Sequence, residues 1–210
     1  MFKKKKILIL APHTDDGELG CGGTVAKLIE DGNEVFYIAF SICEESVPDG
    51  YPKDILATEC KLATKQLGIP KTNLILHKFP VRKLNFHRQE ILEILVQLRE
   101  KIKPDIIFMP SSVSLHQDHI TIYHEGVRAF KHYTCFGYEL PWDTTGFPTG
   151  TFFTLGKKHI QKKWNAIKKY ETQNFRSYCD KEFLFGLARV RGAQIAQRYA
   201  EAFESIRTVY

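Results

Sequence analysis

Short runs of apolar residues alternate along the chain with segments of helical periodicity. Buried strands are predicted at residues 6–11, 34–40, 74–79 and 105–110, and helices at residues 24–30, 54–67 and 88–101. Because the strand segments are apolar at almost every residue, both faces of their sheet must be covered. Right-handed crossover helices between parallel strands provide that cover. The pattern therefore predicts an α/β fold: Rossmann-like, doubly wound, with a mostly parallel sheet and helices on both faces.

The second half of the chain departs from this regular alternation. A helix is predicted at residues 118–131, strand-like segments at 135–140 and 151–155, and a basic helix from residue 157. Residues 183–202 are predicted to be largely helical. The loop at residues 141–150 is predicted to form a lid or a wall of a substrate site.

The composition predicts one soluble domain. With 210 residues, 43% of them hydrophobic, the chain can bury a sizeable core but is short for two domains, so residues 1–210 are predicted to form one. The N-terminal apolar run, residues 7–12, is too short for a signal peptide or a membrane span, so we expect a cytoplasmic protein without stable membrane insertion. The five cysteines are odd in number and widely spaced, which favours reduced, buried thiols.

The net charge of +6 concentrates in two places, residues 3–6 and 156–169. In the second segment apolar residues recur at helical spacing, so its lysines are predicted to form a solvated helix face. The charge is modest and no nucleic-acid reader motif accompanies it, so no nucleic-acid partner is expected. The basic balance mildly favours a phosphorylated small molecule as substrate.

A first polar cluster directly follows the first predicted strand. The sequence PHTDDGELGCGGT, residues 12–24, contains His13, Asp15, Asp16 and Glu18. Its glycines do not follow G-x-G-x-x-G, so the dinucleotide fingerprint is absent. Adjacent carboxylates repel each other unless a cation or a proton lies between them. Asp15 and Asp16 beside a histidine therefore suit one metal ligand and one catalytic base.

A second cluster, LHQDH at residues 115–119, follows the strand predicted at 105–110. It contains His116, Asp118 and His119, and two histidines with a carboxylate are a common ligand set for catalytic zinc. Each cluster alone is also compatible with a turn or a helix cap. Because loops after parallel strands meet at one edge of the sheet, the two clusters together favour one shared metal site.

These motifs resemble those of the PIG-L/LmbE-like zinc-dependent N-deacetylases, which carry A-H-P-D-D-E before a glycine-rich turn and H-P-D-H later. The resemblance extends to Gly68, to residues 170–173 and to the segment YAEAF at 199–203, and so covers nearly the whole chain. It implies a GlcNAc-type deacetylase, a hydrolase that acts on a linear amide bond.

The resemblance implies a role for each residue that matches the family motifs. His13, Asp16 and His119 would bind Zn²⁺ or an exchangeable divalent transition metal, and Asp15 would be the general base that deprotonates metal-bound water. Protonated His116 would stabilise the oxyanion and assist departure of the amine. Asp118, which we count with the catalytic group, would orient a histidine.

The chain departs from the family pattern at several positions. Glu18 stands one place later than the family glutamate, and we assign it to helix capping or loop support. Many members carry a substrate-holding arginine shortly before the equivalent of Glu59, where this chain has Leu56, Ala57 and Thr58. Three arginines are candidates to replace it, because guanidinium groups bind phosphate in bidentate fashion: Arg82, Arg189 and Arg191. Surface salt bridges are the alternative role for each of them.

The substrate implied by the resemblance is a small N-acetylated sugar, a nucleotide sugar or a glycolipid, and the protein could be a homo-oligomer. Glu44, Glu45 and Trp142 could touch the sugar, with loop solvation or loop anchoring as alternatives. The remaining histidines are predicted not to bind metal: His77, His87, His124, His132 and His159.

Two other classes of function stay open. A metal-dependent hydrolase could act on another amide or on a phosphoester, although a phosphoesterase would usually need a second metal and more carboxylates. A non-catalytic α/β binding module is the other alternative. It is disfavoured because Asp15 is present together with all three implied ligands.

Overall fold

Seven strands form one sheet in the computed structural model, which describes residues 2–209. In chain order they are β1 (Lys6–His13), β2 (Glu34–Ser41), β3 (Leu74–Leu76), β4 (Ile106–Pro110), β5 (Thr134–Tyr138), β6 (Thr151–Thr154) and β7 (Ala200–Arg207). Across the sheet the order is β3-β2-β1-β4-β5-β7-β6. Strands β1 to β5 are parallel, whereas β7 runs antiparallel to both β5 and β6. The predicted mostly parallel sheet is therefore confirmed.

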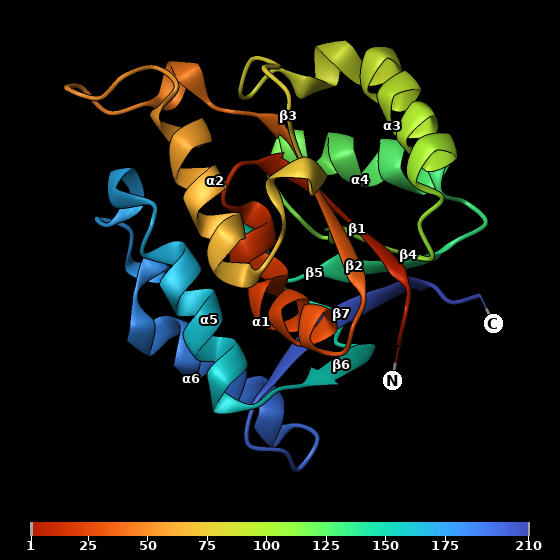
Figure 1. Ribbon diagram of the computed structural model, residues 1–210, viewed down its shortest axis with the longest axis vertical. Coiled ribbons are helices and arrows are strands. Elements are labelled where there is room, and N and C mark those ends of the chain that lie inside the picture. The colour runs from red at the N-terminus through yellow and green to blue at the C-terminus, as the bar shows by residue number, and fades with distance from the viewer. Residues whose placement is uncertain (1, 210) are drawn as a thin grey trace.

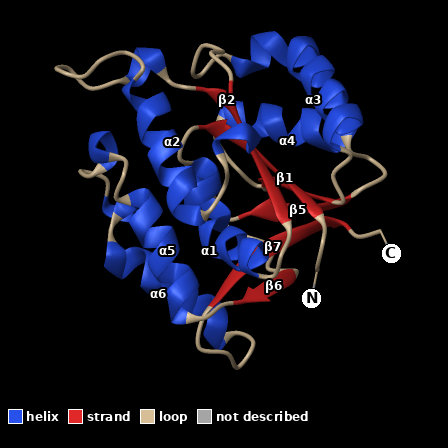
Figure 2. Cartoon of the chain, viewed as in Figure 1, coloured by secondary structure: helices blue, strands red, loops and turns tan. Residues whose placement is uncertain are grey.

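Helices cover both faces of this sheet (Figures 1 and 2). They are α1 (Asp16–Glu30), α2 (Ile55–Leu67), α3 (Arg88–Ile102), α4 (Gln117–Ala129), α5 (Lys157–Ile167) and α6 (Lys181–Ala193). Helices α3 and α4 contribute to one apolar core, and α1, α2 and α5 to the core on the opposite face. Gly68 ends α2 with a φ of +99°, a conformation that favours glycine.

The alternation of side chains along β1 feeds both cores. Ile7 and Ile9 belong to the core shared with α1, while Leu8 and Leu10 belong to the core shared with α3 and α4. All four side chains are fully buried, and such burial stabilises the fold by about 1.5–3 kcal/mol for each side chain. This explains why the strand is apolar throughout.

The glycine-rich segment after β1 is helical rather than a turn. The sequence predicts a helix only from Thr24, but α1 begins at Asp16. A Cβ atom at Gly20 would lie 2.3 Å from the ring of Tyr138, so glycine here allows the helix to approach the sheet closely. Tertiary packing thus outweighs the low helix propensity of glycine.

The C-terminal prediction is wrong in its second half. The segment 183–202 was expected to be largely helical, but α6 ends at Ala193 and β7 begins at Ala200. A Cβ atom at Gly192 would lie 2.7 Å from the carbonyl oxygen of Gln197, because the chain folds back against the helix at this point. Strand β7 then pairs with β5 and β6, a long-range pairing that local periodicity does not encode.

Strand β3 is shorter than the predicted 74–79. Beyond Leu76 the pairing with β2 becomes irregular: the amide of His77 donates to the carbonyl of Ala39, at 2.8 Å, and that of Phe79 to the carbonyl of Phe40, at 3.1 Å. The segment then turns through Arg82, whose φ is +66°. The loop after β3 is thereby directed towards the carboxyl edge of the sheet.

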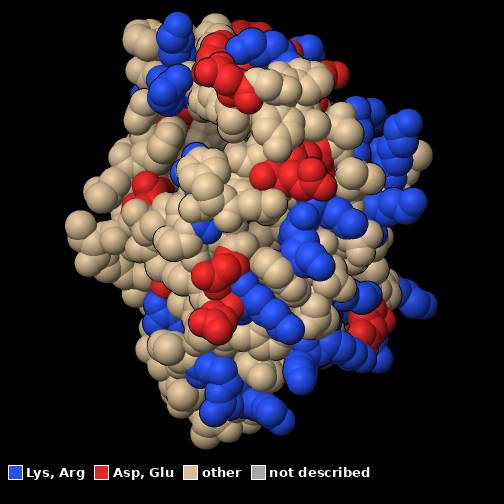
Figure 3. Space-filling model, turned by 90° about the vertical axis from the view of Figure 1, so that its left-hand side faces the viewer, with Lys and Arg blue, Asp and Glu red and all other residues tan. Residues whose placement is uncertain are grey.

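Acidic and basic side chains are interspersed on the face that carries α5 and α6 (Figure 3). Lys157, Lys158 and Lys162 of α5 are exposed, as predicted for a solvated helix face. Lys163 differs, because it is buried and forms an ion pair of 2.7 Å with Glu201 of β7.

The five cysteines are buried free thiols. No helix within residues 2–209 is both long and apolar enough to cross a membrane.

Candidate active site

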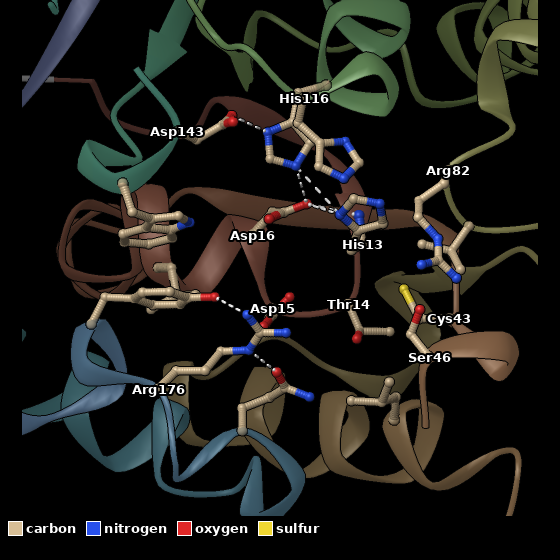
Figure 4. Close-up of a pocket in the computed structure, with 17 residues that line it drawn as sticks. His13, Thr14, Asp15, Asp16, Cys43, Ser46, Arg82, His116, Asp143 and Arg176 are labelled. Carbon is tan, nitrogen blue, oxygen red and sulfur yellow. Dashed lines mark hydrogen bonds and ion pairs between the residues drawn. The ribbon is translucent and has the colours of Figure 1, made fainter. Parts of the chain in front are cut away.

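The loop between β1 and α1 places three polar side chains at the carboxyl edge of the sheet. His13 is the last residue of β1, and its backbone amide donates to Asp16 Oδ2 at 2.8 Å. Asp15 occupies the N-cap position of α1, yet its carboxylate caps no backbone amide of the helix. The Asp15 side chain instead lines a cavity, as Figure 4 shows.

The second motif forms the start of α4. His116 is its N-cap residue, and its Nδ1 accepts a hydrogen bond of 3.1 Å from the backbone amide of Asp118. His119 lies one turn further along and is 4% exposed. The start of α4 thus directs His116 and His119 into the same cavity as His13, so the structure brings the two predicted clusters together.

Three side-chain atoms from the two motifs converge on one point. His13 Nδ1 lies 3.1 Å from Asp16 Oδ2, His119 Nε2 lies 3.3 Å from Asp16 Oδ2, and the two ring nitrogens are 3.3 Å apart. Ligands of a tetrahedral zinc ion, with bonds of about 2.0–2.1 Å, are separated by about 3.3 Å. The triangle therefore has the dimensions of one face of such a site. His116 joins His13 and His119 in a wider group of three histidines that could also hold a metal ion.

Each of the two histidines in the triangle uses its other ring nitrogen to bond a carboxylate. His13 Nε2 is 2.9 Å from Asp118 Oδ2, and His119 Nδ1 is 2.9 Å from Asp143 Oδ2. Such outer carboxylates fix the tautomer and the orientation of a metal-binding imidazole. Asp118 thus contacts a histidine as predicted. Asp143, in the loop at 141–150, was missed, because a lone aspartate in an irregular loop carries no motif.

The charges in the triangle stabilise one another. Burial would raise the pKa of Asp16, but His119 and His13 lower it well below its usual range. Burial also lowers the pKa of both histidines, yet Asp16 outweighs this effect, together with Asp118 at His13 and Asp143 at His119. Together these contacts raise the pKa of His119 to about 9. A site that attracts protons so strongly also attracts a divalent cation, which competes with the protons for the same atoms.

Asp15 and His116 differ from the triangle in their electrostatics. Burial raises the pKa of Asp15 to about 6, and the charge of Asp16 adds to this effect. Burial lowers the pKa of His116, and the charges of His13 and His119 lower it further. Asp15 is thus close to the ideal pKa for a general base near neutral pH.

The cavity that contains these residues has a volume of about 330 Å³, within the range of small-molecule sites. Its walls come from loops at the carboxyl edge and from the segment after α5; they include Ser46, Leu56, Val81, Arg82, Trp142, Gln173, Arg176 and Tyr178. The loop at 141–150 therefore supplies part of the wall, as predicted. Trp142 stacks on Tyr178 with ring centroids 3.8 Å apart.

Of the three arginines proposed for substrate contact, only Arg82 lines this cavity. Arg191 pairs with Glu139 away from it, in agreement with the salt-bridge alternative, and Arg189 donates to the backbone of Arg198. Glu44 and Glu45 are absent from the lining, and Glu44 pairs with Lys78. Arg176 was missed, because no periodicity or motif marks the segment between α5 and α6.

Glu18 supports the loop between β1 and α1 through buried hydrogen bonds and does not cap α1. Its buried carboxylate accepts hydrogen bonds from the hydroxyl groups of Tyr37 and Tyr170, the latter at 2.8 Å. Both hydroxyls also contact the carbonyl oxygen of Thr14, at 3.0 and 2.5 Å. Burial raises the pKa of Glu18 to about 8. The network holds the backbone immediately before Asp15, which matches the predicted loop support.

The model of the family described as GlcNAc-PI de-N-acetylase, PIG-L, matches residues 8–130, which include both polar motifs. The chain belongs to the PIG-L family. Asp143 and Arg176, which also line the cavity, lie outside the part that matches.

Curated relatives of this PIG-L protein include deacetylases. The uncharacterized deacetylase YaiS of Escherichia coli is 27% identical over 178 residues, 81% of this chain and 92% of the relative. The diacetylchitobiose deacetylase of Thermococcus kodakarensis is 30% identical over 127 residues, 58% of this chain and 46% of the relative.

The fold itself serves more than one reaction. The 4-carboxy-2-hydroxymuconate hydratase of Pseudomonas putida has a TM-score of 0.78 to this chain at 18% identity, with 98% of each chain covered. A likeness of this kind shows a shared fold only. The reaction of this PIG-L protein must therefore be argued from its site.

Proposed function

We propose that this protein is a zinc-dependent deacetylase that hydrolyses the N-acetyl group of an amino sugar or sugar conjugate. The observation that carries the proposal is the triangle of His13 Nδ1, Asp16 Oδ2 and His119 Nε2, with the Asp15 carboxylate beside it in the same cavity. Membership of the PIG-L family and the deacetylase relatives support the choice of reaction.

The donor set suits zinc, since two imidazoles and one carboxylate leave positions open for water and substrate. Zinc bound there would supply Lewis acidity towards the amide carbonyl and towards water. The chain's own contribution is to hold the three donor atoms in place, and the carboxylates of Asp118 and Asp143 do so through the histidines.

Asp15 is the proposed general base. Its carboxylate is close to the triangle, makes no capping bond and has a pKa raised to about 6 by burial, so it is ionised at neutral pH and still basic enough to accept a proton from water. Attack of that water on the carbonyl carbon gives a tetrahedral intermediate. When the intermediate collapses, the proton that Asp15 accepted passes to the leaving nitrogen and the C–N bond breaks. The products are acetate and the free amine.

His116 is the proposed partner of the oxyanion. Because its Nδ1 accepts a hydrogen bond from the amide of Asp118, a neutral ring carries its proton on Nε2. That N–H can donate to the oxygen of the tetrahedral intermediate from the neutral ring, in place of the protonated ring that the resemblance implies. Burial and the nearby histidines favour the neutral form before substrate binds.

The test is release of acetate by zinc-reconstituted protein from N-acetylglucosamine, diacetylchitobiose and nucleotide-linked N-acetyl sugars, with chelated protein as a control. Asp15→Asn should retain zinc and lose about 10²–10⁴-fold in kcat. The matched control is Asp49→Asn, an exposed aspartate outside the cavity, which should retain full activity. Normal turnover of Asp15→Asn would refute its role as the base.

Elemental analysis separates this proposal from other hydrolases. One zinc per chain agrees with the one triangle of donor atoms identified within residues 2–209. Two metals per chain with phosphoester hydrolysis would favour a phosphoesterase instead. Absence of acetate release from every N-acetylated sugar, with one zinc bound, would refute the amino-sugar substrate and favour another amide.

A further inference from the structure

Two arginines on the cavity wall have no carboxylate partner within residues 2–209. The side chains of Arg82 and Arg176 both line the cavity, and neither takes part in an ion pair there. Other arginines do find such partners: Arg88 and Arg128 pair with Glu125, Arg99 with Glu100, and Arg191 with Glu139. The positive charge on the cavity wall is therefore available to a ligand.

Arg176 is held in place by neutral groups. Its Nε donates to the side-chain oxygen of Gln173 at 2.5 Å, and one terminal nitrogen donates to the hydroxyl of Tyr178 at 2.7 Å. The guanidinium also lies over the ring of Phe175, 5.2 Å from its centroid. A guanidinium group has five N–H donors, so several remain for a ligand. Because the side chain is already ordered, binding would cost less conformational entropy.

The backbone of Arg82 is tied to the candidate metal site. Its amide donates to Asp118 Oδ2 at 2.6 Å, and the amide of Leu84 donates to Asp118 Oδ1 at 3.1 Å. Asp118 in turn bonds His13. These bonds position Arg82 relative to the triangle, while its guanidinium makes no hydrogen bond to any other residue that the structure describes.

Two of the carboxylates that line the cavity, Asp16 and Asp143, already contact histidines or a hydroxyl group. Asp16 contacts His13 and His119, and Asp143 contacts His119 and the hydroxyl of Ser114. Figure 4 shows the guanidinium of Arg176 close to Asp15, with Arg82 on another side of the cavity beside His13. The charge of Arg176 lowers the pKa of Asp15, although the two groups form no ion pair. An anionic group on the ligand would balance the remaining positive charge.

We propose that Arg82 and Arg176 bind an anionic substituent, a phosphate or a carboxylate, on the N-acetylated sugar whose amide lies at the His13–Asp16–His119 triangle. This inference rests on the proposed deacetylase function and narrows its substrate class to anionic sugars. Guanidinium groups bind both kinds of oxyanion through paired N–H donors, and two of them match the double charge of a phosphate monoester.

The alternative is that Arg176 only adjusts the pKa of Asp15 or only fills part of the cavity wall. In that case, removal of its charge would affect neutral and anionic sugars by the same factor. A role in anion binding predicts a loss that is selective for the anionic sugar. The comparison of matched sugars therefore decides between the two.

The experiment is calorimetric titration of the zinc-loaded Asp15→Asn protein, in which turnover is suppressed, with four sugars. These are N-acetylglucosamine, its 1-phosphate, its 6-phosphate and the carboxylate-bearing N-acetylmuramic acid. At least one anionic sugar should bind about tenfold or more tightly than N-acetylglucosamine. The phosphates and the carboxylate distinguish the two sources of anionic oxygen.

Substitution then tests the two arginines. Arg82→Gln and Arg176→Gln together should abolish the preference for the anionic sugar, whereas Arg189→Gln, outside the cavity, should preserve it. Urea unfolding of each variant controls for folding. Equal binding of all four sugars, or a preference that survives the double substitution, would overturn the inference.

Acetate release by the unsubstituted zinc protein from the same four sugars tests the proposed function separately. Release of acetate at equal rates from neutral and anionic sugars would support the proposed deacetylase function and refute the proposed anionic substrate class. Tighter binding of an anionic sugar that depends on both arginines, without release of acetate, would support the anion-binding site and refute deacetylation of these sugars.

Discussion

At the scale of single residues, Asp15 and Asp16 show how neighbours of the same type acquire different properties. Asp16 faces two histidines, which lower its pKa, while burial beside another carboxylate raises the pKa of Asp15 to about 6. Environments that separate the pKa values of adjacent groups allow one to serve as a ligand and the other as a base. The residue types alone leave open which aspartate takes which role, and the family resemblance supplied the assignment.

The pH dependence of the reaction follows from Asp15. A general base must be ionised, so kcat/KM should fall as the pH decreases through about 6 and should level off above it. The measurement is a profile of kcat/KM from pH 5 to 9 with the zinc protein. Metal content must be checked at pH 5, because loss of zinc would mimic the decline. A flat profile down to pH 5 with zinc retained would contradict the assignment.

At the scale of elements, the fold-back between α6 and β7 depends on Gly192. A Cβ atom there would lie 2.7 Å from the carbonyl oxygen of Gln197 and 2.8 Å from the carbonyl carbon of Arg198, both backbone atoms that cannot easily move. Gly192→Ala should therefore lower the free energy of unfolding by about 2–3 kcal/mol. Urea denaturation measures this change.

The matched control lies in the same helix. A Cβ atom at Gly186 would meet nothing within 4 Å, so Gly186→Ala should be neutral or should stabilise the protein by up to about 1 kcal/mol through helix propensity. Equal effects of the two substitutions would show that packing against β7 does not explain Gly192.

At the scale of the whole molecule, the candidate metal site joins two distant parts of the chain, the end of β1 and the start of α4. Zinc bound to the folded state alone should stabilise it by about 2.7 kcal/mol at a hundredfold excess over Kd. For a chain of this size that corresponds to an increase in Tm of about 5–10 °C.

His119→Ala should abolish the increase in Tm, because it removes one corner of the triangle. His124→Ala is the control, since His124 is exposed and lies outside the cavity. Differential scanning calorimetry with and without zinc makes the comparison. An undiminished increase in the His119→Ala protein would place the metal elsewhere.

Local sequence patterns predicted most of the parallel half of the fold and the centre of the site. Buried strands such as β1 and β4 are apolar throughout, and the motifs around His13 and His119 directly follow the strands that position them. The antiparallel half was predicted less well. Strand β7 has no periodicity that distinguishes it from the end of a helix, and its state is decided by pairing with β5 and β6.

The sequence by itself determined the alternation of strands and helices from β1 to α4, the two polar motifs and the edge of the sheet at which they meet, because hydrophobic periodicity is a local property. Tertiary structure alone decided the triangle of ligand atoms, the contact of Asp143 with His119 and the entry of Arg176 into the cavity. These arise from segments far apart along the chain, so their distances and charges exist only once the sheet has brought the segments together.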